Sequence, residues 1–102
     1  MTSTYTRLPL STSRLRRFCR KYHIRKLAFF GSVLRDDFRP TSDVDVLVEF
    51  ETEYNPGLEF FLIELELSHI LRRKVDLNTP NFLEPEIRHR VIAEAVVQYE
   101  QS

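Results

Sequence analysis

Hydrophobic and polar positions alternate along this chain with two periods, one typical of helices and one typical of strands. Residues 12–23 place an apolar side chain every three or four positions, which predicts a helix that ends near His23. Ser11, Thr12 and Ser13 are candidate N-caps for it. The buried stripe of this helix is expected to consist of Leu15, Phe18, Cys19 and Tyr22.

Three short segments favour strands instead. Residues 27–30 form an apolar run that ends at Gly31, and residues 32–38 have the length for about two helical turns. Residues 43–50 alternate strictly, so one face would carry Val44, Val46, Val48 and Phe50, and the other Asp43, Asp45, Leu47 and Glu49. Lys74 to Leu77 predicts a third strand around Asp76. Only ten residues separate Ser32 from Asp43, whereas a parallel crossover needs a dozen or more, so the first two strands should be antiparallel.

Two further helices are expected. Residues 58–73 carry two apolar stripes on opposite sides, whereas a surface helix normally needs one. One stripe should pack on the sheet, and the other is either a surface for a partner or second copy, or is covered by the C-terminal segment. The last helix is predicted from Pro85 to about Gln98, with a core face of Leu83, Ile87, Val91, Ile92 and Ala95.

Composition narrows the class of protein. The 102 residues are 42% hydrophobic and have no net charge, which predicts one domain over 1–102 with an irregular arm over 1–12. No apolar run has the roughly 18–20 residues that span a bilayer, and the lone Cys19 excludes an internal disulfide, so we expect a cytoplasmic protein without membrane contact. Residues 1–26 carry eight Lys and Arg and no acid, a pattern of a solvated face or of a surface that attracts anions.

The candidate chemistry lies around Gly31 and the aspartates. A Gly31-Ser32 turn can bring backbone N–H groups against a phosphate, and Arg35 lies one turn further on. Asp36 and Asp37 follow as alternative partners for Arg35. Asp43 and Asp45, two positions apart on one strand face, are hard oxygen ligands of the kind that Mg²⁺ prefers. Asp76 sits in an apolar strand where an acid has no structural role, so it is a third candidate.

The combination of apolar strand, Gly31-Ser32, ten residues, Asp43-x-Asp45 and a later strand with Asp76 resembles the nucleotidyltransferase signature of the DNA polymerase β superfamily. It looks most like the minimal nucleotidyltransferases, the small antitoxins of HEPN/MNT toxin–antitoxin systems. The resemblance extends over about residues 13–100 and includes the closing segment from Leu83 to Val96. It implies an α+β fold, a small mixed sheet with flanking helices, as in the core of kanamycin nucleotidyltransferase.

The resemblance also implies a reaction. ATP would be the substrate and Mg²⁺ the cofactor, held by Asp43, Asp45 and Asp76, with Gly31, Ser32 and Arg35 at the phosphates. AMP would pass to a hydroxyl, expected to be a tyrosine of a cognate HEPN RNase toxin, which the transfer silences. A non-catalytic antitoxin that acts by binding remains the alternative. RNA binding, suggested by the basic first helix, ranks last because aromatic platforms for bases are not evident. The sequence leaves open the acceptor residue, the number of AMP units, the nucleotide preference and the oligomeric state, including a homo-oligomer through the 58–73 helix.

Overall fold

The computed structural model of the chain describes residues 11–35, 39 and 41–101, and everything below concerns these residues. The predicted arm over 1–12 therefore falls almost wholly outside them. The elements follow one another as helix α1 (Thr12–Lys21), strand β1 (Ile24–Phe30), a 3₁₀ turn (Gly31–Leu34), β2 (Val44–Phe50), α2 (Glu59–Leu71), β3 (Val75–Asn78), a second 3₁₀ turn (Pro80–Phe82), α3 (Pro85–Glu94) and β4 (Val96–Glu100).

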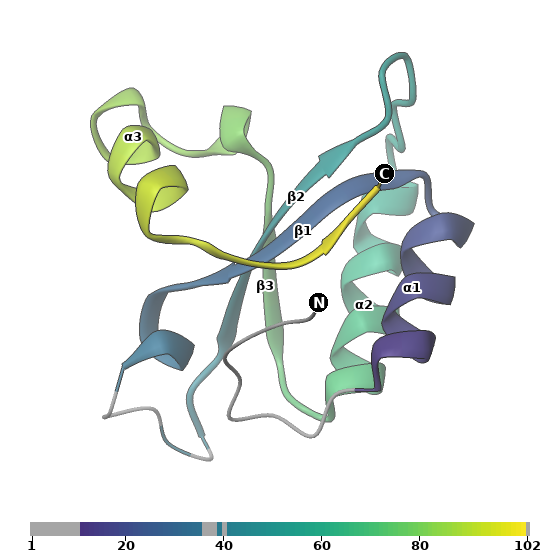
Figure 1. The fold of residues 1–102 in the computed structure, drawn as a ribbon, viewed down its shortest axis with the longest axis horizontal. Coiled ribbons are helices and arrows are strands. Elements are labelled where there is room, and N and C mark those ends of the chain that lie inside the picture. The colour runs from purple at the N-terminus through teal and green to yellow at the C-terminus, as the bar shows by residue number, and fades with distance from the viewer. Residues whose placement is uncertain (1–10, 36–38, 40, 102) are drawn as a thin grey trace.

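The four strands form one mixed sheet in the order β3-β2-β1-β4 (Figure 1). Strand β1 is antiparallel to both of its neighbours, β2 and β4, while β2 and β3 run parallel. The sequence-based expectations of a mixed sheet and of antiparallel first strands are confirmed. Helix α2 supplies the crossover that a parallel pair requires.

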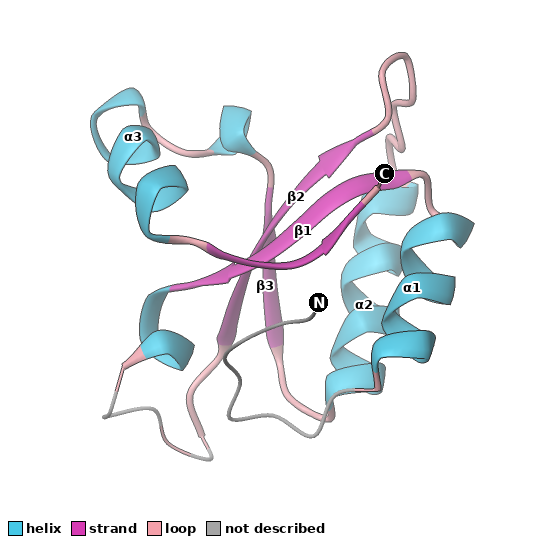
Figure 2. Cartoon of the chain, in the orientation of Figure 1, coloured by secondary structure: helices cyan, strands magenta, loops and turns pink. Residues whose placement is uncertain are grey.

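Helices α1 and α2 lie side by side on one face of the sheet, and α3 lies apart from them (Figure 2). Ser11 caps α1 by accepting a hydrogen bond from the Arg14 N–H, and the whole predicted stripe of this helix is buried. Val44, Val46 and Val48 are buried on the same face of β2 and join this core. Fully burying each such side chain contributes about 1.5–3 kcal/mol, so this face anchors the fold.

The outer edge of β3 is covered by side chains of α2. The backbone N–H of Val75 donates to the Ser68 hydroxyl at 3.0 Å, and the N–H of Leu77 donates to Glu64 Oε2 at 2.8 Å. An unpaired strand edge exposes backbone donors and invites pairing with another chain. Helix α2 satisfies two of these donors, so a four-residue strand is held at the margin of the sheet.

Two local predictions near the candidate site need correction. Strand β1 begins at Ile24, three residues earlier than expected, because His23 turns the chain with a positive φ of 58° directly after α1. In place of two helical turns there is one 3₁₀ turn over Gly31–Leu34, after which Arg35 is extended. Residues 36–38 lie outside the described part of the chain.

The C-terminal prediction is wrong in its second half. Helix α3 ends at Glu94, and Val96–Glu100 forms strand β4 against β1. The run Val96-Val97-Gln98-Tyr99 is rich in residues that favour strands, and pairing with the free edge of β1 outweighs the helical period. Of the expected core face Leu83 is buried, whereas Ile87 and Ile92 are exposed.

Helix α2 keeps one of its two apolar stripes in contact with solvent. Ile63, Leu67 and Leu71 are buried against the sheet. The opposite stripe is 60–84% exposed, and we call it the outer face of α2: Leu58, Phe61, Leu62 and Leu65. The C-terminal segment does not cover it, which removes that alternative. Within the described residues, the structure holds no helix with the length and hydropathy that crossing a bilayer demands.

Candidate active site

Three aspartates meet where β2 and β3 begin. Asp43 immediately precedes β2, Asp45 lies within it, and Asp76 is the direct register partner of Asp45 on β3. Register partners on neighbouring strands project to the same face of a sheet. This face is opposite to the buried valines, so the alternation in the sequence is confirmed: the valines form the core, and the acids lie on the open side.

The structure brings the three carboxylates close enough to influence one another. Burial of Asp45 raises the pKa of its carboxyl above the ordinary value, and the charges of Asp76 and Asp43 raise this pKa further. Arg35 opposes this change through its positive charge. Asp43 and Asp76 are exposed. Within the described residues no hydrogen bond or ion pair reaches these three carboxylates, and the charge of Arg35 offsets only part of the effect of burial and repulsion on Asp45.

Gly31 lies directly against the Asp45 carboxylate. Its φ is +76°, in the region that L side chains rarely adopt, and a Cβ at this position would lie 2.3 Å from Asp45 Oδ2. Both observations favour glycine here, because a larger residue would be strained and would displace the Asp45 carboxylate. The opposite partner of Asp45 in the sheet is Phe30, the residue before this glycine, so β1 ends beside the middle carboxylate. The Gly-Ser turn and Asp45 therefore lie next to each other, and their shared role in one site stays a prediction.

Ser32 and Arg35 complete the same corner. The Ser32 hydroxyl donates to the backbone carbonyl of Asp43 at 3.4 Å, and the Arg35 N–H donates to the Ser32 carbonyl at 2.9 Å, which closes the 3₁₀ turn. The Arg35 side chain is exposed and near enough to act on Asp45. Asp36 and Asp37, the alternative partners for Arg35, lie outside the described residues.

The donor chemistry of this cluster suits a hard divalent cation. Mg²⁺ takes few carboxylates together with other oxygens, and three mutually repelling carboxylates are stabilised by such an ion. In the described part of the chain, His, Cys, Asp and Glu side chains do not gather as a preformed set of three or more metal ligands. The ligand roles of Asp43, Asp45 and Asp76 therefore stay predictions that rest on register, charge and donor type.

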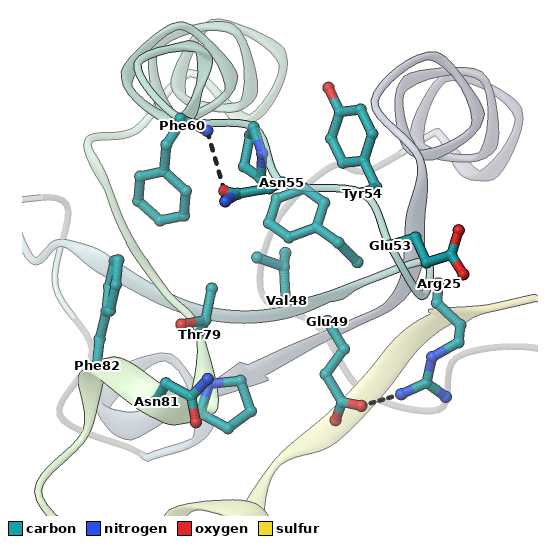
Figure 3. Close-up of a pocket in the computed structure, with 14 residues that line it drawn as sticks. Arg25, Val48, Glu49, Glu53, Tyr54, Asn55, Phe60, Thr79, Asn81 and Phe82 are labelled. Carbon is teal, nitrogen blue, oxygen red and sulfur yellow. Dashed lines mark hydrogen bonds and ion pairs between the residues drawn. The ribbon is translucent and has the colours of Figure 1, made fainter.

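A second feature, which the sequence analysis missed, lies at the far end of the same strands. A hollow of about 780 Å³ is bounded by the end of β2, the start of α2 and the turn after β3. Figure 3 shows Tyr54, Phe60 and Phe82 around it, with Glu49 held by Arg25 at its rim. The ring of Phe60 packs edge-on against that of Phe82 with 5.2 Å between centroids. Several segments that are far apart in the sequence line this hollow, so no local sequence motif predicts it.

The comparisons with known proteins agree with the geometry at the aspartate end. The nucleotidyltransferase domain family matches residues 13–97. This chain belongs to that family. As a nucleotidyltransferase, it carries the Gly31-Ser32 turn and the aspartates inside the matched span.

Two archaeal relatives extend the comparison. A Methanocaldococcus jannaschii protein, provisionally named protein adenylyltransferase MJ0435, is 36% identical over 74% of this chain and 81% of its own length. The protein adenylyltransferase MntA of Thermococcus cleftensis is 36% identical over 74% of this chain and 76% of its own. The chain is therefore similar, over most of its length, to proteins named for transfer of AMP to protein.

Solved structures support the fold. One that is provisionally described as a minimal nucleotidyltransferase has a TM-score of 0.69 and 30% identity over 83% of this chain and 86% of its own. A toxin–antitoxin structure with AMP-PNP has a TM-score of 0.71 over 91% of this chain and 76% of its own, at 16% identity. The second likeness establishes the fold alone. The small α+β nucleotidyltransferase core expected from the sequence is confirmed.

Proposed function

We propose that this chain transfers AMP from ATP to a hydroxyl of a partner protein, with Mg²⁺ as cofactor, and that it acts in this way as an antitoxin. One observation carries the proposal. Asp45 and Asp76 are register partners on the open face of the sheet, with Asp43 beside them, and the three carboxylates repel one another. Such a cluster destabilises a folded chain unless a cation neutralises it, so its presence favours a catalytic role.

The residues of the site have distinct roles in this proposal. Asp43, Asp45 and Asp76 would hold Mg²⁺, which when bound neutralises charge on the phosphates and on the leaving pyrophosphate. Gly31 lets the backbone approach the triphosphate closely, and the Ser32 hydroxyl can turn from the Asp43 carbonyl to a phosphate oxygen. Arg35, exposed beside Asp45, offers a cation to the same phosphates. Asp76, which is exposed at the sheet margin, would orient the acceptor hydroxyl or accept its proton.

The acceptor that we propose is a tyrosine of a HEPN-type RNase toxin. The names of the archaeal relatives and the toxin–antitoxin structure of the same fold support a protein acceptor. The outer face of α2 is the docking surface that we propose for that toxin, since its four large apolar side chains are exposed together and exposed apolar patches mark interaction sites. A second copy of the chain on the same face is the alternative occupant.

The test uses the product of the neighbouring gene as acceptor. We expect its intact mass to increase by one or more AMP units when it is incubated with this chain, ATP and MgCl₂. Asp45→Asn should abolish the increase. Glu49→Gln is the matched control, because Glu49 lies on the same strand and face but pairs with Arg25 outside the cluster. Peptide mapping then identifies the modified residue, and modification at a residue other than tyrosine would correct that part of the proposal.

A second function, neutralisation by binding alone, is favoured by the exposed outer face of α2. The variant Asp43→Asn/Asp45→Asn separates the two functions. If it still neutralises the toxin at equal concentration, binding suffices. If it forms the complex but no longer neutralises, transfer is required. Leu62→Asp is the complementary variant, expected to weaken the complex while leaving the aspartates intact.

A further inference from the structure

Asp43 differs from the other two aspartates because it lies outside the strand ladder. Strand β2 begins at Val44, whose N–H donates to the Lys74 carbonyl at 2.8 Å. On its other side, Asp43 follows a turn closed by the bond from the Ser42 N–H to the Arg39 carbonyl at 2.9 Å. The position of the Asp43 carboxylate thus depends on what holds this turn.

The side chain of Arg73 holds the turn between Arg39 and Ser42 in place. Its Nη2 donates to the backbone carbonyl of Arg39 at 2.5 Å and to that of Ser42 at 2.9 Å. The Ser42 hydroxyl also accepts from the Arg39 N–H at 3.1 Å. One guanidinium nitrogen therefore bridges the two residues that close the turn, and Asp43 is the next residue along the chain. The rigid, planar guanidinium can serve two carbonyls at once.

The backbone around Arg73 is fixed by the end of α2. Arg72 adopts the left-handed conformation with a φ of 58°, and the Arg73 N–H then donates to the Ser68 carbonyl at 3.2 Å. A non-glycine residue in this conformation is uncommon and ends the helix abruptly. It turns the chain so that Arg73 reaches the turn before Asp43 while Lys74, the next residue, pairs with Val44.

The Arg73 guanidinium donates to two backbone carbonyls of the turn before Asp43. The cation that lowers the pKa of Asp45 is Arg35, from the other side of the site. Arg35 acts on the Asp45 carboxylate through its charge, and the two bonds from Arg73 hold the chain that leads into Asp43.

We propose that Arg73 is a positioning residue for nucleotidyl transfer, which sets the place of Asp43 relative to Asp45 and Asp76 by clamping the turn between Arg39 and Ser42. The inference rests on the proposed function, since it assigns Asp43 to the reacting cluster. It adds a residue from the α2–β3 junction, which no motif of the sequence singled out.

The test compares Arg73→Met with Lys74→Met, a matched loss of an adjacent base whose carbonyl contact to Val44 does not need its side chain. Hydrogen exchange of the Val44 amide measures the hold on the turn, and Mn²⁺ binding measures the carboxylate cluster without turnover. In Arg73→Met we expect exchange to accelerate about 10-fold, Mn²⁺ affinity to fall about 10-fold and kcat to fall about 10–100-fold, with KM for ATP within about twofold. Lys74→Met should match the wild type.

The outcomes separate the two proposals. If Arg73→Met exchanges faster but retains the kcat and the Mn²⁺ affinity of Lys74→Met, Arg73 only stabilises the fold and the inference is overturned. If Arg73→Met does not fold, Arg73→Lys replaces it, with intermediate losses expected in kcat and Mn²⁺ affinity and none if the inference is wrong. A wild-type chain that neither transfers AMP nor binds Mn²⁺ overturns the proposed function, and the positioning role with it.

Discussion

In the part of the chain that the structure describes, the three aspartates at the start of β2 and β3 have no hydrogen bond or ion pair to their carboxylates, whereas three glutamates around the far end of the sheet each have a partner. Glu49 pairs with Arg25, Glu59 accepts the Tyr54 hydroxyl, and Glu51 accepts from Gln101 at 2.6 Å and contacts His23. The hydrogen bonds from Gln101 and His23 lower the pKa of Glu51, while burial and neighbouring acids raise that of Asp45. These three glutamates are satisfied within the fold, whereas the cluster of Asp43, Asp45 and Asp76 is the candidate for an external cation.

Among the variants that test this contrast, Asp45→Asn should have the largest effect. We expect AMP transfer to fall by more than about 100-fold, because even substitutions behind metal ligands cost about 10–100-fold. Thermal stability should rise at neutral pH, since a destabilising charge is removed; a gain of about 2–4 °C corresponds to roughly 0.5 kcal/mol. Rates are measured by intact mass and stability by thermal unfolding.

The pH dependence of this gain has a definite sign. Because the pKa of Asp45 is higher in the folded chain, its ionised form destabilises the fold above that pKa, and the penalty disappears as the pH falls through it. The stability advantage of Asp45→Asn should therefore shrink on acidification. An advantage that is constant with pH would show that the charge of Asp45 is not its source.

Gly31→Ala and Gly57→Ala form a matched pair across the two ends. Both glycines have positive φ, so alanine costs each about 1–2 kcal/mol of folding free energy. A Cβ at Gly31 would also collide with the Asp45 carboxylate, whereas one at Gly57 meets nothing within 4 Å. We expect Gly31→Ala to lose about 100-fold in transfer, the usual effect of a small misplacement, while Gly57→Ala keeps its rate. Equal rates in the two variants would contradict the close contact.

Glu66→Ala should have the smallest effect on transfer. Unlike Asp45→Asn, it should lower the stability of the fold. Glu66 accepts the Tyr22 hydroxyl at 2.5 Å and contacts Lys21 at 3.1 Å; the bond from Tyr22 is the main reason that its pKa is lowered. Losing that bond should cost about 1 kcal/mol with the transfer rate unchanged. Because the folded-state pKa is lowered, the stabilisation by Glu66 is present at neutral pH and is lost as the pH falls through that pKa. Equilibrium denaturation at two pH values checks both points.

The sequence predicted the features whose signals are local. The Asp43-x-Asp45 alternation, the Gly31-Ser32 turn and the isolated Asp76 all follow from short patterns, and the structure places them together. The helix at 12–21 was likewise recognisable from its cap and stripe. For these residues, the spacing along the sequence and the conformational preference of each residue type were sufficient for the prediction.

Features that depend on tertiary pairing were missed. Strand β4 reads as a helix until the free edge of β1 is available to pair with it. The stripe of α2 that would be buried could not be chosen from two similar ones. Arg73 is one of several bases in its segment, and its role follows from carbonyls more than thirty positions away. The hollow at the far end combines segments from β1 to the turn after β3.

The covered edge of β3 has a mechanical consequence. Ser68 and Glu64 tie the backbone of this strand to α2, and Asp76 lies between the two tied residues. The same helix presents its opposite side to solvent. Any displacement of α2 would therefore also move the backbone on both sides of Asp76, so the position of this acid depends on the helix as well as on the sheet.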